Sequence, residues 1–198
     1  MSTDLLIALF GFVVIMCFTP GPNNLMLMAS GTNYGYRPTM PHLLGVVLGF
    51  SLMVVLVGLG LMAAFTRAPE LRTVLKVVSI AYLLYLAWRI ARAAPLNAEA
   101  TRTTRPLTFL QASAFQWVNP KGWTMALTGV TAYAPDQGLW AVLVVSLAFL
   151  LVNSVSGSLW VLIGQKIRRF LTNPTRLAIF NWTMAILLLA TLGPVLFA

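Results

Sequence analysis

Charged side chains are scarce in this sequence of 198 residues: 9% of the residues are charged, while 59% are hydrophobic. Soluble domains are roughly 25% charged and 45–50% apolar, so the composition excludes an ordinary soluble domain. A hydrocarbon core about 30 Å thick requires about 20 apolar residues for each helical span. We therefore predict an all-α integral membrane protein that is surrounded by membrane lipid.

Acids, histidine and cysteine are also nearly absent. The single His42 and the single Cys17 can build neither a metal cluster nor an internal disulfide. Without a buried acid or a nucleophile–base pair, we expect no enzyme, no cofactor and no metal site. The only acids fall in tails or in connections between apolar runs: Asp4, Glu70, Glu99 and Asp136.

Basic residues outnumber acids by 13 to 4, which gives a net charge of +9. In a soluble protein this balance would suggest nucleic-acid binding. Here the basic side chains sit at the ends of apolar runs, where they orient spans and contact anionic headgroups. We therefore do not expect a nucleic-acid partner.

The apolar runs number six and each is long enough to cross a bilayer. They lie near 5–31, 41–65, 74–92, 108–133, 138–164 and 177–197. The side of the membrane with more Lys and Arg faces the cytoplasm, so both termini are predicted to lie outside. The first, third and fifth connections hold Arg37, Arg89, Arg92, Arg102, Arg105, Lys166, Arg168, Arg169 and Arg176, against Arg67, Arg72 and Lys76 on the other side.

The two halves of the chain resemble each other weakly at an offset of 98 residues, which places Pro22 on Pro120 and Gly31 on Gly129. Three spans per half is an odd number, so the second copy must be inverted relative to the first. We predict two inverted repeats, 1–98 and 99–198, in one membrane domain, with the first and fourth helices broken at proline.

The first proposed break lies at Pro20-Gly21-Pro22, because each proline removes a backbone donor. Broken backbone in a membrane is tolerated where it lines a cavity or is buried in protein, and half-helix N-termini can bind a carboxylate. Asn23 and Asn24 add amide groups at the same depth. The alternative is a proline kink whose freed groups are satisfied by neighbouring helices.

The second proposed break follows Asn119-Pro120 and carries Lys121, which is the only charged residue well inside an apolar run. A cation at such depth costs at least about 2.5–3.5 kcal/mol on insertion scales, so it usually has a partner or a function. We expect Lys121 to contact a substrate carboxylate. The alternatives are a snorkelling side chain or a cap on carbonyls that Pro120 leaves bare.

Polar and small residues in the fifth run form one helical face, which includes Asn153, Gly157 and Gly164. Such a stripe suits either a substrate pathway or close helix contact. Gly45 and Gly49 in the second run have the GxxxG spacing, which more often indicates helix packing than function. The predicted substrate-binding set is Pro20, Gly21, Pro22, Asn23, Asn24, Asn119, Pro120, Lys121 and Asn153.

Taken together, these motifs resemble the LysE/RhtB family of bacterial amino-acid exporters, and more loosely its cysteine and O-acetylserine branch. The resemblance rests on Thr19-Pro20-Gly21-Pro22-Asn23, Gly31, Gly45, Gly49 and Trp117-Val118-Asn119-Pro120-Lys121. It implies a six-helix exporter in the inner membrane that is driven by the proton gradient. Many relatives look to have Asp where this chain has Asn23, which puts a carboxylate-based coupling in doubt.

Two other classes of function make different demands on the residues. A transmembrane thiol oxidoreductase needs two facing cysteines, whereas this chain has Cys17 alone and its repeat counterpart is Phe115. A non-transporting channel or assembly subunit stays open as the alternative, and flux against a gradient distinguishes it from an exporter. The sequence leaves the amino acid, the coupling stoichiometry and a homo-oligomeric state undetermined.

Overall fold

The computed structural model describes residues 1–61, 67–68, 70–93, 105–134 and 138–193, and it is helical throughout, with no strand in these ranges. The prediction of an all-α protein is confirmed. The helices are α1 (Thr3–Phe18), α2 (Pro22–Tyr34), α3 (Tyr36–Leu56), η1 (Val57–Leu61), α5 (Glu70–Ala91), α6 (Phe109–Gln116), α7 (Pro120–Tyr133), α8 (Leu139–Ile167), η3 (Arg168–Phe170) and α9 (Pro174–Ala190).

Both predicted proline breaks are present in the chain. The axis bends by 51° between α1 and α2, and Pro22 is the first residue of α2. Pro120 is likewise the first residue of α7, after α6 ends at Gln116. Proline suits this position because the first-turn N–H groups have no intrahelical partner. Adding 98 to the ends of the first break, Phe18 and Pro22, gives the ends of the second.

Glycines allow close packing of α2 against α8. A Cβ atom on Gly31 would overlap the carbonyl oxygen of Val161, and one on Gly164 would overlap the carbonyl oxygen of Met28. Gly45 and Gly49 likewise bring α3 against α6, so the interpretation of their spacing as a packing motif is confirmed. These contacts make α2, α3, α6 and α8 the tightly packed centre of the molecule.

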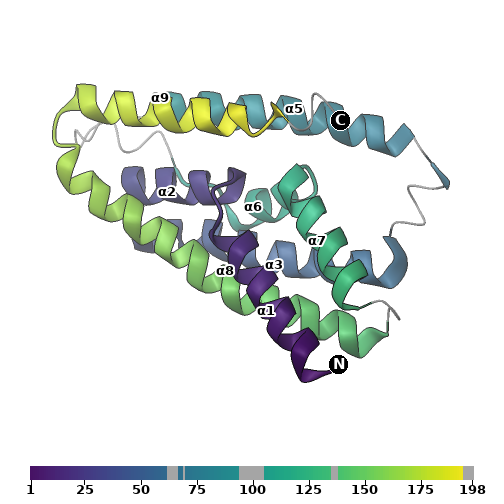
Figure 1. Ribbon diagram of the computed structural model, residues 1–198. Coiled ribbons are helices and arrows are strands. Elements are labelled where there is room, and N and C mark those ends of the chain that lie inside the picture. The colour runs from purple at the N-terminus through teal and green to yellow at the C-terminus, as the bar shows by residue number, and fades with distance from the viewer. Residues whose placement is uncertain (62–66, 69, 94–104, 135–137, 194–198) are drawn as a thin grey trace.

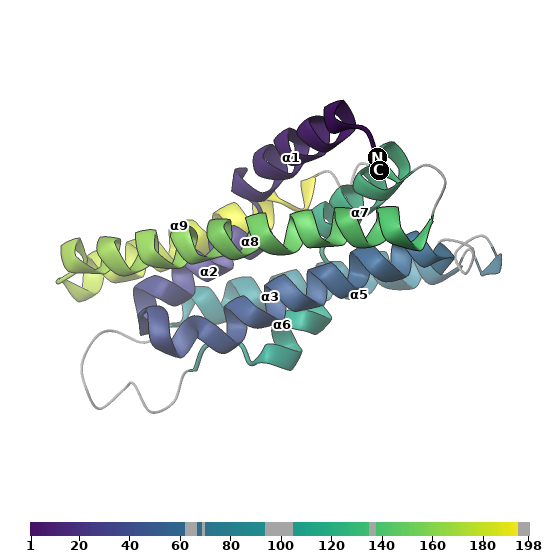
Figure 2. The same cartoon turned by 90° about the horizontal axis from the view of Figure 1, so that it is seen from below.

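The remaining helices surround this centre. Figure 1 shows α5 and α9 side by side along one edge, with α8 crossing the other helices obliquely, and Figure 2 shows α3 running beside α8. Buried aromatic rings connect α3 and α8: Phe149 of α8 stands edge-on to Phe50 of α3 at 5.1 Å between ring centroids. The core therefore extends over most of the bundle.

The outward faces of the helices are apolar. On α8, large apolar side chains recur every fourth residue and are 41–57% exposed: Leu143, Leu147, Leu151, Val155 and Leu159. In water such a continuous stripe would be unfavourable, whereas lipid tails solvate it. The helix is thus built to face the hydrocarbon core of a membrane.

The number of spans is only partly established by helix length. Within the described residues, three helices are long and apolar enough to cross a membrane, or four if the bent pair α1 and α2 is one span. α9 has 17 residues and is shorter, and α6 and α7 are short because of the break before Pro120. The six-span inverted-repeat layout is not confirmed, and the repeat boundary at 98/99 lies outside the described residues.

Candidate functional site

The two proline breaks meet in space. The C-terminal end of α1 and the N-terminal ends of α2 and α7 surround one pocket, and α3 and α8 complete its wall. It is lined by Met16, Cys17, Gly21, Pro22, Asn23, Asn24, Phe50, Asn119, Lys121, Gly122, Met125 and Asn153. We call this the break pocket.

Two helix N-termini open into the break pocket without a side-chain cap. Gly21 is the N-cap of α2 and has no side chain, and Asn119 is the N-cap of α7 but makes no capping hydrogen bond. First-turn amides of an α-helix have no carbonyl partner within the helix, and the helix dipole adds partial positive charge there. The amide ends of α2 and α7 therefore form a weakly positive wall that favours an anion.

Lys121 crosses from α7 to the end of α1. Its Nζ donates a hydrogen bond to the carbonyl oxygen of Thr19 at 2.6 Å. The alkyl stem lies against Gly21, where a Cβ atom would stand 2.7 Å from Lys121 Cδ. Glycine at position 21 thus makes room for the cation. The ammonium keeps further donors, since a lysine has three N–H groups.

The carbonyl groups freed at the end of α1 are largely satisfied by side chains. Asn24 donates to the carbonyls of Cys17 at 2.7 Å and Thr19 at 3.0 Å, and Ser156 of α8 donates to Cys17 at 2.8 Å. With Lys121 on Thr19, these bonds hold the broken backbone inside protein, as the low-dielectric setting requires. The cap on bare carbonyls that the sequence suggested for Lys121 exists, but on Thr19 of the first break.

An amide pair connects the two breaks. Asn23 Nδ2 donates to Gln116 Oε1 at 2.8 Å, and Gln116 Nε2 donates back to Asn23 Oδ1 at 3.2 Å. Gln116 is fully buried and also donates to the carbonyl of Ala112. Sequence reasoning did not select Gln116, although a glutamine at the last residue before a helix break was an available signal.

Acceptor groups complete the break pocket. Asn119 is 2% exposed, and its Oδ1 atom has no hydrogen-bond partner among the described residues. Asn153 of α8 reaches the same pocket. A buried acceptor without a partner is uncommon in proteins, so Asn119 Oδ1 is available to a donor from a bound molecule. The pocket therefore offers cationic donors on one side and amide acceptors on another.

Comparison with known proteins identifies the family. The LysE type translocator family matches residues 14–196. The chain belongs to the LysE family. Two curated relatives, the cysteine/O-acetylserine efflux proteins of Escherichia coli O1:K1 and of Salmonella paratyphi A, are 33% and 34% identical to it over 177 residues. Each alignment covers 85% of this chain and 87% of the relative. No solved structure matches the chain.

Membership of the LysE family makes this chain a transporter and not an enzyme. It also supports the resemblance drawn from the proline motifs, and the structure shows what those motifs do. Of the predicted site residues, all but two line the break pocket: Gly21, Pro22, Asn23, Asn24, Asn119, Lys121 and Asn153. Pro20, which is exposed, and Pro120 lie outside its lining and act on the backbone instead.

Proposed function

We propose that this LysE-family protein exports a small zwitterionic amino acid, of the cysteine and O-acetylserine class, across the bacterial inner membrane. One observation carries the proposal: an ammonium group, two uncapped helix N-termini and an unpaired amide oxygen surround a single pocket at the two helix breaks. The substrates named for the relatives are small amino acids, which agrees with this arrangement.

The substrate carboxylate would bind at the positive side of the break pocket. Lys121 Nζ supplies charge, and the first-turn amides of α2 and α7 supply aligned donors. Charge-assisted hydrogen bonds of this kind are roughly twice as strong as neutral ones. None of the described residues that line the pocket is an acid, so a carboxylate would meet no competing negative charge from them.

The amino group and side chain would face the remaining walls. Asn119 Oδ1 and the amide of Asn153 are neutral acceptors within the same lining. Neutral acceptors suit the ammonium group of a zwitterion, because the substrate's own carboxylate already balances its charge. The apolar members of the wall are Met16, Phe50 and Met125. They favour a short side chain of low polarity, such as a thiol or an ester, over a charged one.

A six-span inverted layout would place these groups near the middle of the membrane. In that layout α1 with α2 and α6 with α7 are corresponding broken spans, and Asn23 corresponds to Lys121 at the offset of 98 residues. Broken helices that meet at the repeat interface are typical of secondary transporters. The two repeats, 1–98 and 99–198, would then form one domain, alone or in a homo-oligomer.

Proton antiport would drive the export. Of the acids in the described residues, Asp4 and Glu70 lie in the first turns of α1 and α5, and neither lines the break pocket. The coupling proton would therefore travel with the substrate, with Lys121 or with a group nearer the surface. Asn23 is a neutral amide, so this position gives the break pocket no carboxylate.

Everted membrane vesicles test the function directly. Vesicles that contain the protein should accumulate radiolabelled O-acetylserine or cysteine above the outside concentration when respiration makes their lumen acidic, and a protonophore should collapse the gradient. Vesicles from cells with the empty vector are the control. Equilibration without accumulation would indicate a channel, and a lack of flux with the whole amino-acid panel would contradict the proposal.

The orientation has its own expected result. Ala93, directly after α5, accepts a hydrogen bond from Asn181 near the middle of α9, and Figure 1 shows the C-terminal ends of α5 and α8, which carry basic residues, toward the same end of the bundle. With this end in the cytoplasm, a periplasm-active reporter fused to the C-terminus should be active, and one inserted at Glu99 should be silent. The opposite pattern would reverse the orientation, and activity at both positions would contradict the odd number of spans, three, that the layout places between Glu99 and the C-terminus.

A further inference from the structure

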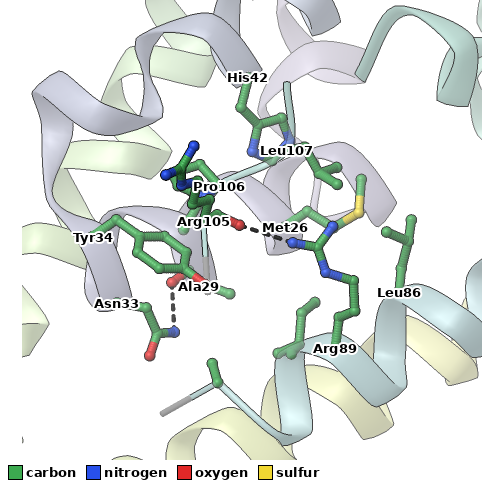
Figure 3. Close-up of a pocket in the computed structure, with 13 residues that line it drawn as sticks. Met26, Ala29, Asn33, Tyr34, His42, Leu86, Arg89, Arg105, Pro106 and Leu107 are labelled. Atoms are coloured by element: carbon green, nitrogen blue, oxygen red, sulfur yellow. Dashed lines mark hydrogen bonds between the residues drawn. The ribbon is translucent and has the colours of Figure 1, made fainter. Parts of the chain in front are cut away.

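A second cavity lies farther along α2, between α2, α3, α5 and residues 105–107 (Figure 3). It measures about 430 Å³ including its open mouth, and about 50 Å³ of this space can hold the centre of a water-sized molecule. It shares no lining residue with the break pocket. We call it the basic pocket.

Arginine gives this cavity its charge. Figure 3 shows the guanidinium of Arg89 reaching inward from α5, where it donates one hydrogen bond to the carbonyl oxygen of Arg105 at 2.8 Å. A guanidinium carries five N–H donors in a fixed fork that matches a carboxylate. Among the described residues, the lining contains Arg89 and Arg105 and no acid. The basic pocket therefore attracts an anion and leaves Arg89 with donors to bind it.

His42 is an independent sign of a ligand. Its side chain is 1% exposed, and neither ring nitrogen has a hydrogen-bond partner in the described part of the chain. Figure 3 shows the ring turned toward the cavity that Arg89 enters. A neutral imidazole has one donor and one acceptor, and buried groups of this kind are almost always paired. Two unpaired nitrogens at a basic cavity indicate that a bound polar molecule forms their missing hydrogen bonds.

The rest of the wall sets the shape of that molecule. Met26, Leu86 and Leu107 form an apolar side, and Asn33 is fixed at the far side by hydrogen bonds to Ala29 and Asn181. The ligand should therefore be small and amphipathic, with an anionic end at Arg89. On α2 the lining of the basic pocket begins at Met26, two residues after Asn24 of the break pocket, and extends past Asn33 toward the C-terminal end of the helix.

We propose that the basic pocket is a second substrate site, in which Arg89 binds the carboxylate of the exported amino acid and His42 hydrogen-bonds its polar groups. This inference rests on the proposed export function. In the proposed orientation the basic pocket is the cytoplasmic one, so it loads first and the break pocket receives the same molecule next. When both pockets are filled at equilibrium, each protein chain binds two substrate molecules.

Equilibrium binding to the purified full-length protein tests this site. In nanodiscs of phosphatidylcholine alone, radiolabelled O-acetylserine should bind at two molecules per chain. Arg89→Gln should remove one of them, Lys121→Gln should remove the other, and Arg176→Gln, at an exposed position on α9, should remove neither. In everted vesicles Arg89→Gln should raise the half-saturating substrate concentration about tenfold and change the maximal rate less than twofold.

His42→Phe separates a ligand contact from a core ring. It keeps a planar ring and deletes two nitrogens that have no protein partner among the described residues, so the folded protein should form at the wild-type level. The second binding event should nevertheless weaken about tenfold. Wild-type binding in His42→Phe and Arg89→Gln would overturn the proposal.

The source of the anion is distinguished in the same assay. Adding cardiolipin or phosphate to the nanodiscs should leave the binding that depends on Arg89 unchanged. If cardiolipin displaces the second substrate molecule, the pocket is a lipid headgroup site and the proposal is wrong. If phosphate alone displaces it, the pocket is a general anion site and the proposal is equally wrong. Absence of any transport by the wild-type protein would instead refute the export function.

Discussion

Replacing Lys121 with methionine should abolish export while the protein still inserts in the membrane. The change removes the charge that we assign to the substrate carboxylate and also the hydrogen bond to Thr19. Lys121→Gln is the more informative variant, because its amide still donates a hydrogen bond but carries no charge. A hydrogen bond to a charged group contributes about 1.5–3 kcal/mol, so Lys121→Gln should bind substrate roughly tenfold to hundredfold more weakly.

Initial export rates in everted vesicles over a range of substrate concentrations measure this effect, and thermal unfolding in detergent reports on stability. Lys166→Gln removes a cation of the same type at the exposed end of α8 and should transport normally. Two results would show that Lys121 only caps the end of α1. Either Lys121→Met exports at the wild-type rate, or Lys121→Gln restores both stability and export.

Substituting Gly31 should prevent normal packing of the bundle. Even an alanine at this position would place its Cβ atom onto the carbonyl oxygen of Val161, which is backbone and cannot turn away. Overpacking of this kind typically costs about 1–3 kcal/mol, and leucine should cost more than alanine. We expect Gly31→Ala to lower the unfolding temperature and Gly31→Leu to leave little folded protein in the membrane.

Gly11→Ala is the matched control, because a Cβ atom at Gly11 of α1 would have nothing within 4 Å. Yield after detergent extraction, a monodisperse elution profile and the unfolding temperature are the measurements. Gly31→Ala and Gly11→Ala should differ clearly in all three. Equal stability of these two variants would mean that α2 and α8 do not approach as closely as described.

The helix breaks could be predicted because they depend on local chemistry. Proline removes a backbone donor, and Pro22 after Gly21 and Pro120 after Asn119 each begin a helix, whereas Pro41 lies inside α3. The meeting of Lys121 with the first break could also be anticipated, since the repeat offset aligned it with Asn23. What the sequence could not specify was the partner: Thr19 accepts from Lys121 through its backbone, which every residue possesses.

The other contacts depend on how helices far apart in sequence approach each other. Gln116 joins Asn23 because the end of α6 meets the start of α2, and the position of Gln116 before a helix break marks it as notable without indicating which residue it contacts. Arg89 was counted as an orienting charge and His42 as an unsuitable metal ligand, and neither pattern indicates that both line one cavity. The apolar composition established the membrane setting, but helix length alone does not establish all six spans.

The contact of Gly31 and Gly164 with opposing backbone restricts which parts of the molecule can move. A shift of α2 along α8 by one residue would bring side chains into space that only hydrogen atoms now occupy. These two helices should therefore behave as one rigid body during transport. Both pockets have a wall on α2, so opening and closing must come from the other walls: α1 and α7 at the break pocket, and α5 at the basic pocket.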